Sequence, residues 1–240
     1  MNSFGFKPFL RASAGLPFQD RWAVMPLRAS LPLAAEKIEK QWNLLQQSPI
    51  SGNKKLIYIH IPFCETHCQF CGFYQNLLRK FDTDKYITTL LAEITLEMNN
   101  PVMQSAPIHA IYFGGGTPSA LPAGQLARVI SLLRQSLPLA PDCEITIEGR
   151  ISDFDEARTE SYIAAGANRF SIGVQTFETD IRQKLGRLSS REQIVETFER
   201  IGRLDCVALV CDLMFGFAGA NWCKAGRLIW SWQPLCRWTG

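Results

Sequence analysis

The chain has 240 residues, of which 47% are hydrophobic and 20% are charged, and its formal net charge is +3. This balance is typical of a globular protein with a substantial core, in one large domain or two small ones. The charge is too small to indicate nucleic acid as a partner. No run of about 18 apolar residues predicts a membrane span, and the first residues lack the apolar centre of a secretory signal. The expected location is the cytoplasm, where most of the eight cysteines stay reduced.

The first 53 residues are predicted to form an N-terminal extension. Four prolines interrupt regular structure before residue 33, and a helical pattern then covers about 34–47. The stretch "SPISGN" (48–53) is typical of a linker. We therefore expect the main domain to begin at Lys54.

From Lys54 onward, short apolar runs alternate with helical patterns. Strands are predicted at 56–61, 109–113, 144–148, 169–174 and 206–213. Helices are predicted at 82–99 with Asp82 as N-cap, at 123–136, at 155–165, and after a capping box from Ser189 to Glu192.

This alternation, with strands that are almost continuously apolar, indicates an α/β fold with a parallel sheet buried on both faces. A barrel or partial barrel and an open doubly wound sheet both fit the pattern. In either architecture, functional side chains belong at the C-terminal ends of the strands.

Unusual polar features follow each predicted strand. The stretch "FCETHCQFC" (63–71) follows the first strand, and "GGGTPS" (114–119) follows the second. Glu148 ends the third strand, Gln175 follows the fourth, and Asp212 lies near the end of the fifth. Because the C-terminal ends of parallel strands meet at one edge of a sheet, we expect these groups to form one site.

The cysteine-rich stretch favours metal or redox chemistry over disulfides, because its three cysteines lie so close together in a reducing compartment. Thiolates suit iron–sulfur clusters and zinc. A cubane cluster normally takes four cysteines, so three leave one iron open for a substrate or cofactor. His67 would complete a Cys3His zinc set, but its adjacency to Cys68 disfavours two ligands on one tetrahedral ion. The other strand cysteines, predicted to be small buried hydrophobes, are Cys143, Cys206 and Cys211.

The glycine run in "GGGTPS" either closes a tight turn or presents backbone N–H groups to a ligand. One or two glycines suffice for a turn, so three favour close approach of a ligand. The stretch lacks the lysine of a P-loop. Glu148 would accept hydrogen bonds from ribose hydroxyls or cap the next helix, and Phe70 would pack in its loop or stack on a base. Each of Gln175, Arg187 and Asp212 could equally be an ordinary surface residue or a residue that supports the site without contacting a ligand.

Four stretches together resemble a known family: "IYIHIPFCETHCQFC", "YFGGGTPS", "GVQTFETDIRQKLGR" and "CDLMFG". Over residues 55–217 they are similar to the radical S-adenosylmethionine (radical SAM) enzymes, in the branch of oxygen-independent coproporphyrinogen III oxidase. The stretches "CGFYQN" and "TIEGR", the latter in place of the more usual "TIEANP", resemble the haem-utilisation subgroup HutW/ChuW. Members of that subgroup open the haem ring anaerobically and release iron. The resemblance implies a partial TIM-type barrel over 54–217, here apparently truncated after about five strands.

The resemblance also implies roles for individual residues. Cys64, Cys68 and Cys71 would hold a [4Fe–4S] cluster whose open iron chelates S-adenosylmethionine. An electron from the reduced cluster would cleave that cofactor to a 5′-deoxyadenosyl radical, and a second S-adenosylmethionine would supply a methyl-derived radical to the tetrapyrrole. No residue is assigned as catalytic acid or base. The positions that would contact S-adenosylmethionine are Tyr58, Phe70, Gly115, Gly116, Thr117, Glu148, Gln175, Arg187 and Asp212.

The implied partners are haem or another tetrapyrrole as substrate and an electron donor such as flavodoxin or ferredoxin. Two related alternatives stay open at this point. One is an enzyme that decarboxylates coproporphyrinogen, and the other is a haem chaperone (HemW-like) that binds haem without consuming it. A third interpretation is an inactive fragment.

The stretch after Met214-Phe215-Gly216 departs from the family pattern, which continues with "LPGQT". Here the last residues hold four of the six tryptophans and no acidic residue, and their apolar positions follow no regular period. We interpret 218–240 as an atypical tail, read out of frame, with a divergent natural tail as the alternative. A barrel shortened in this way would expose a sheet edge, so poor solubility and impaired turnover are expected.

Overall fold

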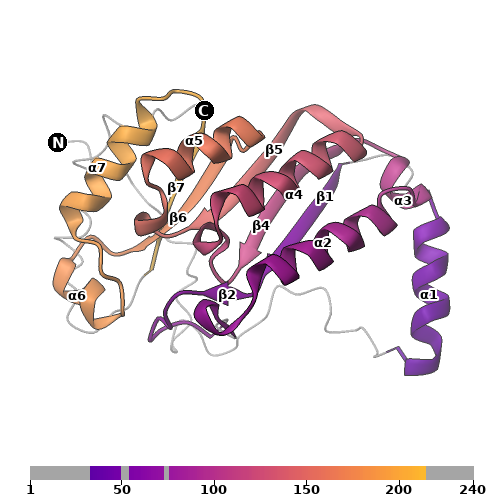
Figure 1. The fold of residues 1–240 in the computed structure, drawn as a ribbon, viewed down its shortest axis with the longest axis horizontal. Coiled ribbons are helices and arrows are strands. Elements are labelled where there is room, and N and C mark those ends of the chain that lie inside the picture. Colours follow the sequence, from indigo (N-terminus) through magenta and orange to yellow (C-terminus); the bar gives the residue numbers. More distant parts are fainter. Residues whose placement is uncertain (1–32, 50–53, 73–75, 215–240) are drawn as a thin grey trace, which may run out of the picture. The chain divides into compact units, whose positions relative to one another are not determined.

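The computed structural model describes residues 33–49, 54–72 and 76–214, and its centre is a five-stranded parallel sheet (Figure 1). The strand order is β1-β4-β5-β6-β7, and every pairing is parallel. A short separate pair joins β2 (Phe63–Cys64) to β3 (Asn76–Leu77). The strands of the large sheet are β1 (Lys55–Ile61), β4 (Ile108–Gly115), β5 (Leu139–Gly149), β6 (Arg169–Gln175) and β7 (Ala208–Leu213).

Helices connect the strands of the sheet. In Figure 1, α2, α4, α5 and α7 lie over the same face of the sheet. Short turns of 3₁₀ helix in the described part of the chain occur at Leu78–Lys80, Pro118–Ala120 and Ile151–Asp153. The helices are α2 (Thr83–Glu97), α3 (Pro101–Gln104), α4 (Ala123–Ser136), α5 (Glu156–Ala165), α6 (Thr179–Lys184) and α7 (Arg191–Gly202).

The strand order decides between the two architectures that fit the sequence. Each strand pairs with the next strand of the sheet in chain order, without the reversal that a doubly wound sheet requires. Helices on one face and a sequential parallel sheet are the arrangement of a barrel wall. The sheet does not close, since β1 and β7 are both edge strands of the described sheet. The predicted partial barrel is therefore confirmed, and the doubly wound alternative is wrong.

The two faces of the sheet differ in chemistry. On β1, the isoleucines Ile59 and Ile61 are buried toward the helices, whereas Leu56 and Tyr58 are 72% and 57% exposed. In the central strands the second face is buried but polar, with Thr146 on β5 and Ser171 on β6. The prediction of two buried faces therefore holds for β5 and β6 and is wrong for the edge strand β1. The polar side chains on this second face could therefore contact a ligand on the inner side of the curved sheet.

Helix boundaries follow the capping residues. The Asp82 carboxylate accepts a hydrogen bond from the Lys85 amide at 3.0 Å, which confirms it as the N-cap of α2. The capping box of α7 is formed by Ser190 and Gln193, one residue later than predicted. The helix starts later because the carbonyl of Ser189 accepts a hydrogen bond from Arg182 Nε at 2.8 Å.

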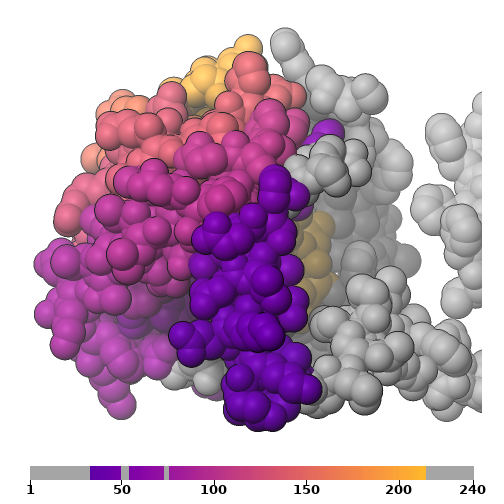
Figure 2. Space-filling view, turned by 90° about the vertical axis from the view of Figure 1, so that its right-hand side faces the viewer, coloured from indigo at the N-terminus to yellow at the C-terminus, as the bar shows by residue number. Residues whose placement is uncertain are grey.

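Helix α1 (Ala35–Gln47) crosses the boundary between two compact units, which divide at Trp42 and Asn43. Its side chains are exposed or half-buried, including Ile38 and Trp42, and the helix is drawn in indigo in Figure 2. The predicted domain limits at 53 and 217 and the tail 218–240 fall outside the described residues. Across the described helices, none is long and apolar enough to cross a membrane.

Candidate functional site

The cysteine loop begins at β2, at the C-terminal end of β1, as the sequence predicts. Cys64 and Cys68 are buried, and Cys71 is half-buried. All three are free thiols. The loop closes on itself through a 3.0 Å hydrogen bond from the Cys71 amide to the Cys68 carbonyl. A second bond, from the Gln69 amide to the Leu185 carbonyl at 3.3 Å, ties it to the end of α6.

Two of the three sulfurs accept hydrogen bonds from other elements. The Thr117 hydroxyl donates to Cys64 Sγ at 3.3 Å, and Arg150 Nη2 donates to Cys68 Sγ at 3.4 Å. Burial raises the pKa of the Cys64 thiol, while the Thr117 hydrogen bond and the charge of Arg150 oppose that increase. Cys64 Sγ therefore lies in a buried setting in which two neighbouring groups offset part of the cost of a thiolate.

The donor set bears on the kind of metal centre that the loop could hold. Among the described residues, no three Cys, His, Asp or Glu side chains converge as one metal ion would require. The geometry thus gives no support to the Cys3His zinc alternative. A cubane places each thiolate on a different iron, so its ligands do not converge on one point. Three free thiols, two of them already hydrogen-bonded, fit an iron–sulfur cluster.

The glycine run holds the cysteine loop. The Gly116 amide donates to the Ile61 carbonyl and the Thr117 amide to the Phe63 carbonyl, each at 2.7 Å. Gly115 has a φ of +112°, and a Cβ at Gly116 would lie 2.4 Å from the Phe63 carbonyl oxygen. The expectation that the run leaves these amides open to a ligand is therefore wrong for 116 and 117, because the neighbouring loop occupies them.

Replacing Gly116 by alanine is expected to lower the free energy of unfolding by roughly 1–3 kcal/mol, because the methyl group would overlap the backbone of Phe63. Urea unfolding measures the change. Gly124→Ala in α4 is the matched control, since a Cβ there meets no atom within 4 Å. The control should stay unchanged or gain up to about 1 kcal/mol of helix propensity. Equal unfolding midpoints for the two variants would contradict the close packing at Gly116.

A row of polar side chains crosses the second face of the sheet. Tyr58 on β1 stacks on Tyr112 of β4, with ring centroids 6.3 Å apart. The Tyr112 hydroxyl donates to Glu148 Oε1 at 2.6 Å. Ser171 on β6 donates to Asp212 Oδ2 on β7 at 3.0 Å. Burial, followed by the hydrogen bond to Glu148, raises the pKa of Tyr112, so the phenol stays protonated and holds the carboxylate.

Gln175 at the end of β6 and Arg187, which follows α6, both lie against Gly173 of β6. Gln175 is buried and has a φ of +68°, an uncommon conformation that turns the chain at the strand end. A Cβ at Gly173 would lie 2.9 Å from Gln175 Nε2, so this glycine makes room for the amide. Arg187 donates to the Gly173 carbonyl at 3.3 Å, and its guanidinium carbon lies 5.7 Å from the Phe70 ring centroid. Burial lowers the pKa of Arg187, while the nearby Cys68 opposes that change.

Comparison with known proteins decides the family. The sequence profile of the Radical SAM superfamily matches residues 58–229, a range that begins within β1 and includes the other described strands. The chain belongs to the radical SAM superfamily. Members of this family bind a [4Fe–4S] cluster and S-adenosylmethionine. The match continues into the segment after 217 that lies outside the described residues.

Individual relatives place this radical SAM chain near haem and porphyrin proteins. It is 48% identical over 220 residues to anaerobilin synthase of Escherichia coli O157:H7, covering 92% of this chain and 49% of the relative. It is 34% identical over 167 residues to the heme chaperone HemW of Bacillus subtilis, covering 69% and 43%. The solved coproporphyrinogen III oxidase (HemN) of Escherichia coli aligns with a TM-score of 0.70 and 25% identity, over 82% and 45% of the two chains. The chain thus spans about half the length of these relatives.

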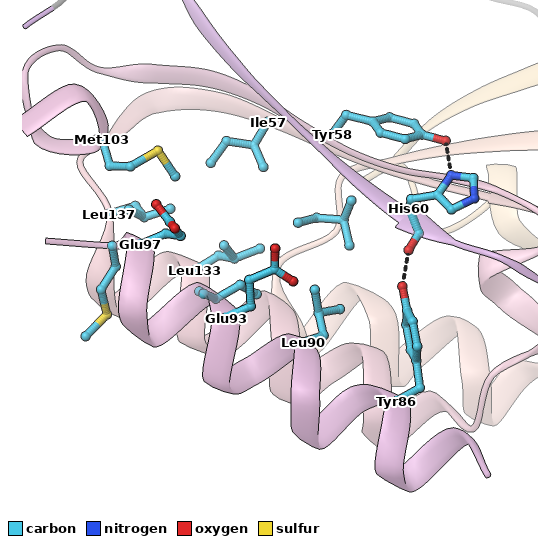
Figure 3. A pocket seen from close by; sticks show the side chains of 13 residues that line it. Ile57, Tyr58, His60, Tyr86, Leu90, Glu93, Glu97, Met103, Leu133 and Leu137 are labelled. Carbon is cyan, nitrogen blue, oxygen red and sulfur yellow. Dashed lines mark hydrogen bonds between the residues drawn. The ribbon is translucent and has the colours of Figure 1, made fainter. Parts of the chain in front are cut away.

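A cavity of about 320 Å³ lies between β1 and α2 of the radical SAM fold, on the helix side of the strand (Figure 3). Its lining is mostly apolar, with the carboxylates of Glu93 and Glu97 among it. At one side, Tyr58 hydrogen-bonds His60 Nδ1 at 3.0 Å, and Tyr86 donates to the His60 carbonyl at 2.5 Å. Tyr58 is the one predicted site residue in this lining, so the cavity is separate from the cysteine loop.

Sequence reasoning missed two residues that support the radical SAM site. Tyr112 holds Glu148, and its position two residues before the glycine run was available as a signal. Arg150 reaches the cysteine loop from the segment "TIEGR", and the only signal in that segment is its family resemblance. Of the other cysteines, Cys143 is buried as predicted, Cys211 is half-buried, and Cys206 is exposed because it precedes β7.

Proposed function

We propose that this chain forms the core of a radical SAM enzyme of anaerobic haem degradation, which methylates and opens the tetrapyrrole and releases its iron. The observation that supports this most strongly is the 48% identity to anaerobilin synthase over 92% of the chain. The identity to a haem chaperone is lower, at 34% over 69% of the chain. The relatives are about twice as long as this chain. We therefore propose the activity for a whole protein of that length, in which this chain is the core.

In this proposal, Cys64, Cys68 and Cys71 hold the cluster. When bound, the cluster and S-adenosylmethionine supply radical chemistry through one-electron cleavage of the sulfonium. The three thiols are free, and two of them receive hydrogen bonds from Thr117 and Arg150. These donors stabilise sulfur as thiolate, the form that binds iron.

The polar row is proposed to hold S-adenosylmethionine. Glu148, fixed by the Tyr112 hydroxyl, would accept hydrogen bonds from ribose hydroxyls. Gln175 is buried with its amide in the space that Gly173 leaves, and Arg187 has a buried Nε without a hydrogen-bond partner among the described residues. These groups would orient the cofactor. Tyr58, Phe70, the backbone at Gly115 and Gly116, Thr117 and Asp212 complete the proposed contact set.

The same proposal covers the substrate, the electron donor, the location and the domain limits. Haem or another tetrapyrrole would be the substrate, and flavodoxin or ferredoxin would supply electrons in the cytoplasm. Residues 1–53 would form an extension before the radical SAM core of 54–217.

The function is tested by anaerobic incubation of the cluster-loaded protein with haem, S-adenosylmethionine and a reductant. The expected result is consumption of haem and S-adenosylmethionine together, with iron released to a ferrous chelator and methionine formed. Omission of S-adenosylmethionine is the control and should leave haem intact. Haem that stays bound and unchanged would instead support the chaperone function. Decarboxylation of coproporphyrinogen without haem consumption would support the oxidase function.

A further inference from the structure

Arg150 directs its hydrogen bonds to the cysteine loop. Its Nη1 donates to Thr66 Oγ1 at 2.7 Å, and Nη2 donates to the Thr66 carbonyl at 2.8 Å. The same Nη2 lies 3.4 Å from Cys68 Sγ. One guanidinium therefore connects the segment after β5 to both the backbone and a sulfur of the loop. A planar group with several fixed donors suits such a bridge.

The backbone around Arg150 is fixed by buried groups. Its amide donates to Ser119 Oγ at 3.3 Å, and that hydroxyl donates to Asp153 Oδ2 at 2.6 Å. Ser119 is fully buried, and Asp153 is 2% exposed. A Cβ at Gly149 would lie 2.3 Å from Ser119 Oγ, so only glycine permits this contact. The turn after β5 is thus held against the segment "GGGTPS". This contact fixes the backbone position from which the Arg150 side chain extends.

The positive charge of Arg150 has no carboxylate partner among the described residues. The ion pairs there involve Arg158, Arg169 and Arg203. The buried Nε of Arg150 likewise has no hydrogen-bond partner in the described part of the chain. Cys68 Sγ, 3.4 Å from Nη2, would be a negatively charged neighbour of the guanidinium when it binds a metal as a thiolate. Arg150 is half-buried, so water screens its charge only in part, and a negatively charged neighbour is favoured at this place.

We propose that Arg150 is a positioning residue that fastens the cysteine loop and raises the reduction potential of the cluster held there. The proposal rests on the proposed function, since it needs a cluster on Cys68. One-electron reduction adds negative charge to the cluster, and a donor with a positive charge at a ligand sulfur stabilises that reduced form. Hydrogen bonds to ligand sulfurs are an established means of tuning such potentials.

The test compares Arg150→Met with wild type in an anaerobic titration with dithionite, followed by the electron paramagnetic resonance signal of the reduced cluster. The equilibrium constant for reduction is expected to fall roughly tenfold, which corresponds to a shift of about 59 mV to lower potential for one electron. Arg203→Met is the matched control, because it removes one exposed arginine paired only with Glu199. Its potential should equal that of wild type.

Iron and sulfide analysis before the titration separates two kinds of failure. A wild-type protein without a cluster would overturn the proposed function and this inference together. A loaded Arg150→Met protein with the wild-type potential would overturn only the role of Arg150. If Arg150→Met does not fold, Thr66→Val removes the hydroxyl that receives Nη1 and keeps the arginine. A smaller shift in the same direction is expected for Thr66→Val, and no shift would contradict the proposal.

Discussion

Replacing Cys68 by alanine is expected to reduce bound iron and sulfide from about four of each per chain to a small fraction of that content. Cys68 is buried in the centre of the loop, and its sulfur receives the Arg150 hydrogen bond. A cubane held by two thiolates would leave two irons without protein ligands, so the cluster would be lost rather than weakened. Chemical analysis after anaerobic reconstitution, with the ultraviolet–visible spectrum as a second readout, measures the loss.

The matched control is Cys143→Ala. Cys143 is also a buried free cysteine, but it lies on β5 next to the register shift in the pairing with β4 and is not part of the cysteine loop. This variant should keep its full iron and sulfide content while losing some stability through the small cavity. A Cys68→Ala protein that retains a complete cluster would contradict the ligand assignment. Equal losses in both variants would point to unfolding rather than to ligation.

The edge of the sheet where the site lies was predictable from the sequence. Parallel strands joined by helices bring their C-terminal ends together, so Glu148, Gln175 and Asp212 were expected near the cysteine loop. The structure places Glu148 and Asp212 in one polar row and Gln175 beside it. This inference needed only the position of each residue relative to its strand, a property that apolar runs and turn residues define well.

The contacts between elements were not predictable in the same way. Arg150 meets Cys68 across 82 positions of sequence, and Thr117 meets Cys64 across 53. Such pairs depend on strand register and on the course of loops, which no local pattern encodes. The glycine run shows the same limit. Its composition correctly indicated close approach, and the backbone of Phe63, which no local pattern points to, is one group that makes it.

The one-residue error in the α7 capping box has a similar cause. Ser189 and Ser190 each stand three residues before a glutamate or glutamine, so both match the pattern. The choice is made by Arg182, a fully buried side chain whose guanidinium binds the Ser189 carbonyl. Desolvation lowers the pKa of Arg182 to about 10, so it remains charged at neutral pH and keeps these carbonyl contacts. A long-range contact therefore determines which of the two serines is the N-cap of α7.

Replacing Glu148 by glutamine is expected to weaken the binding of S-adenosylmethionine to the cluster-loaded protein. The substitution keeps the shape of the side chain but removes its charge and one strong acceptor. Hydrogen bonds to charged groups contribute about 1.5–3 kcal/mol, so the dissociation constant should rise roughly tenfold to hundredfold. Anaerobic isothermal titration calorimetry measures this change. Iron content should stay at the wild-type level, because Glu148 is not among the proposed cluster ligands.

Glu144→Gln provides the matched control for Glu148→Gln. Glu144 lies four residues earlier on the same strand, is exposed, and forms an ion pair with Arg169 at 3.5 Å. Exposed pairs of this kind contribute about 0–1 kcal/mol to stability, so this variant should bind S-adenosylmethionine like the wild type. Both variants remove one negative charge from β5. A difference between their dissociation constants therefore reports the position of the carboxylate and not the net charge of the protein. If both variants bound S-adenosylmethionine with the wild-type dissociation constant, Glu148 would not contact the cofactor. The polar row between Tyr58 and Asp212 would then serve the structure of the sheet alone.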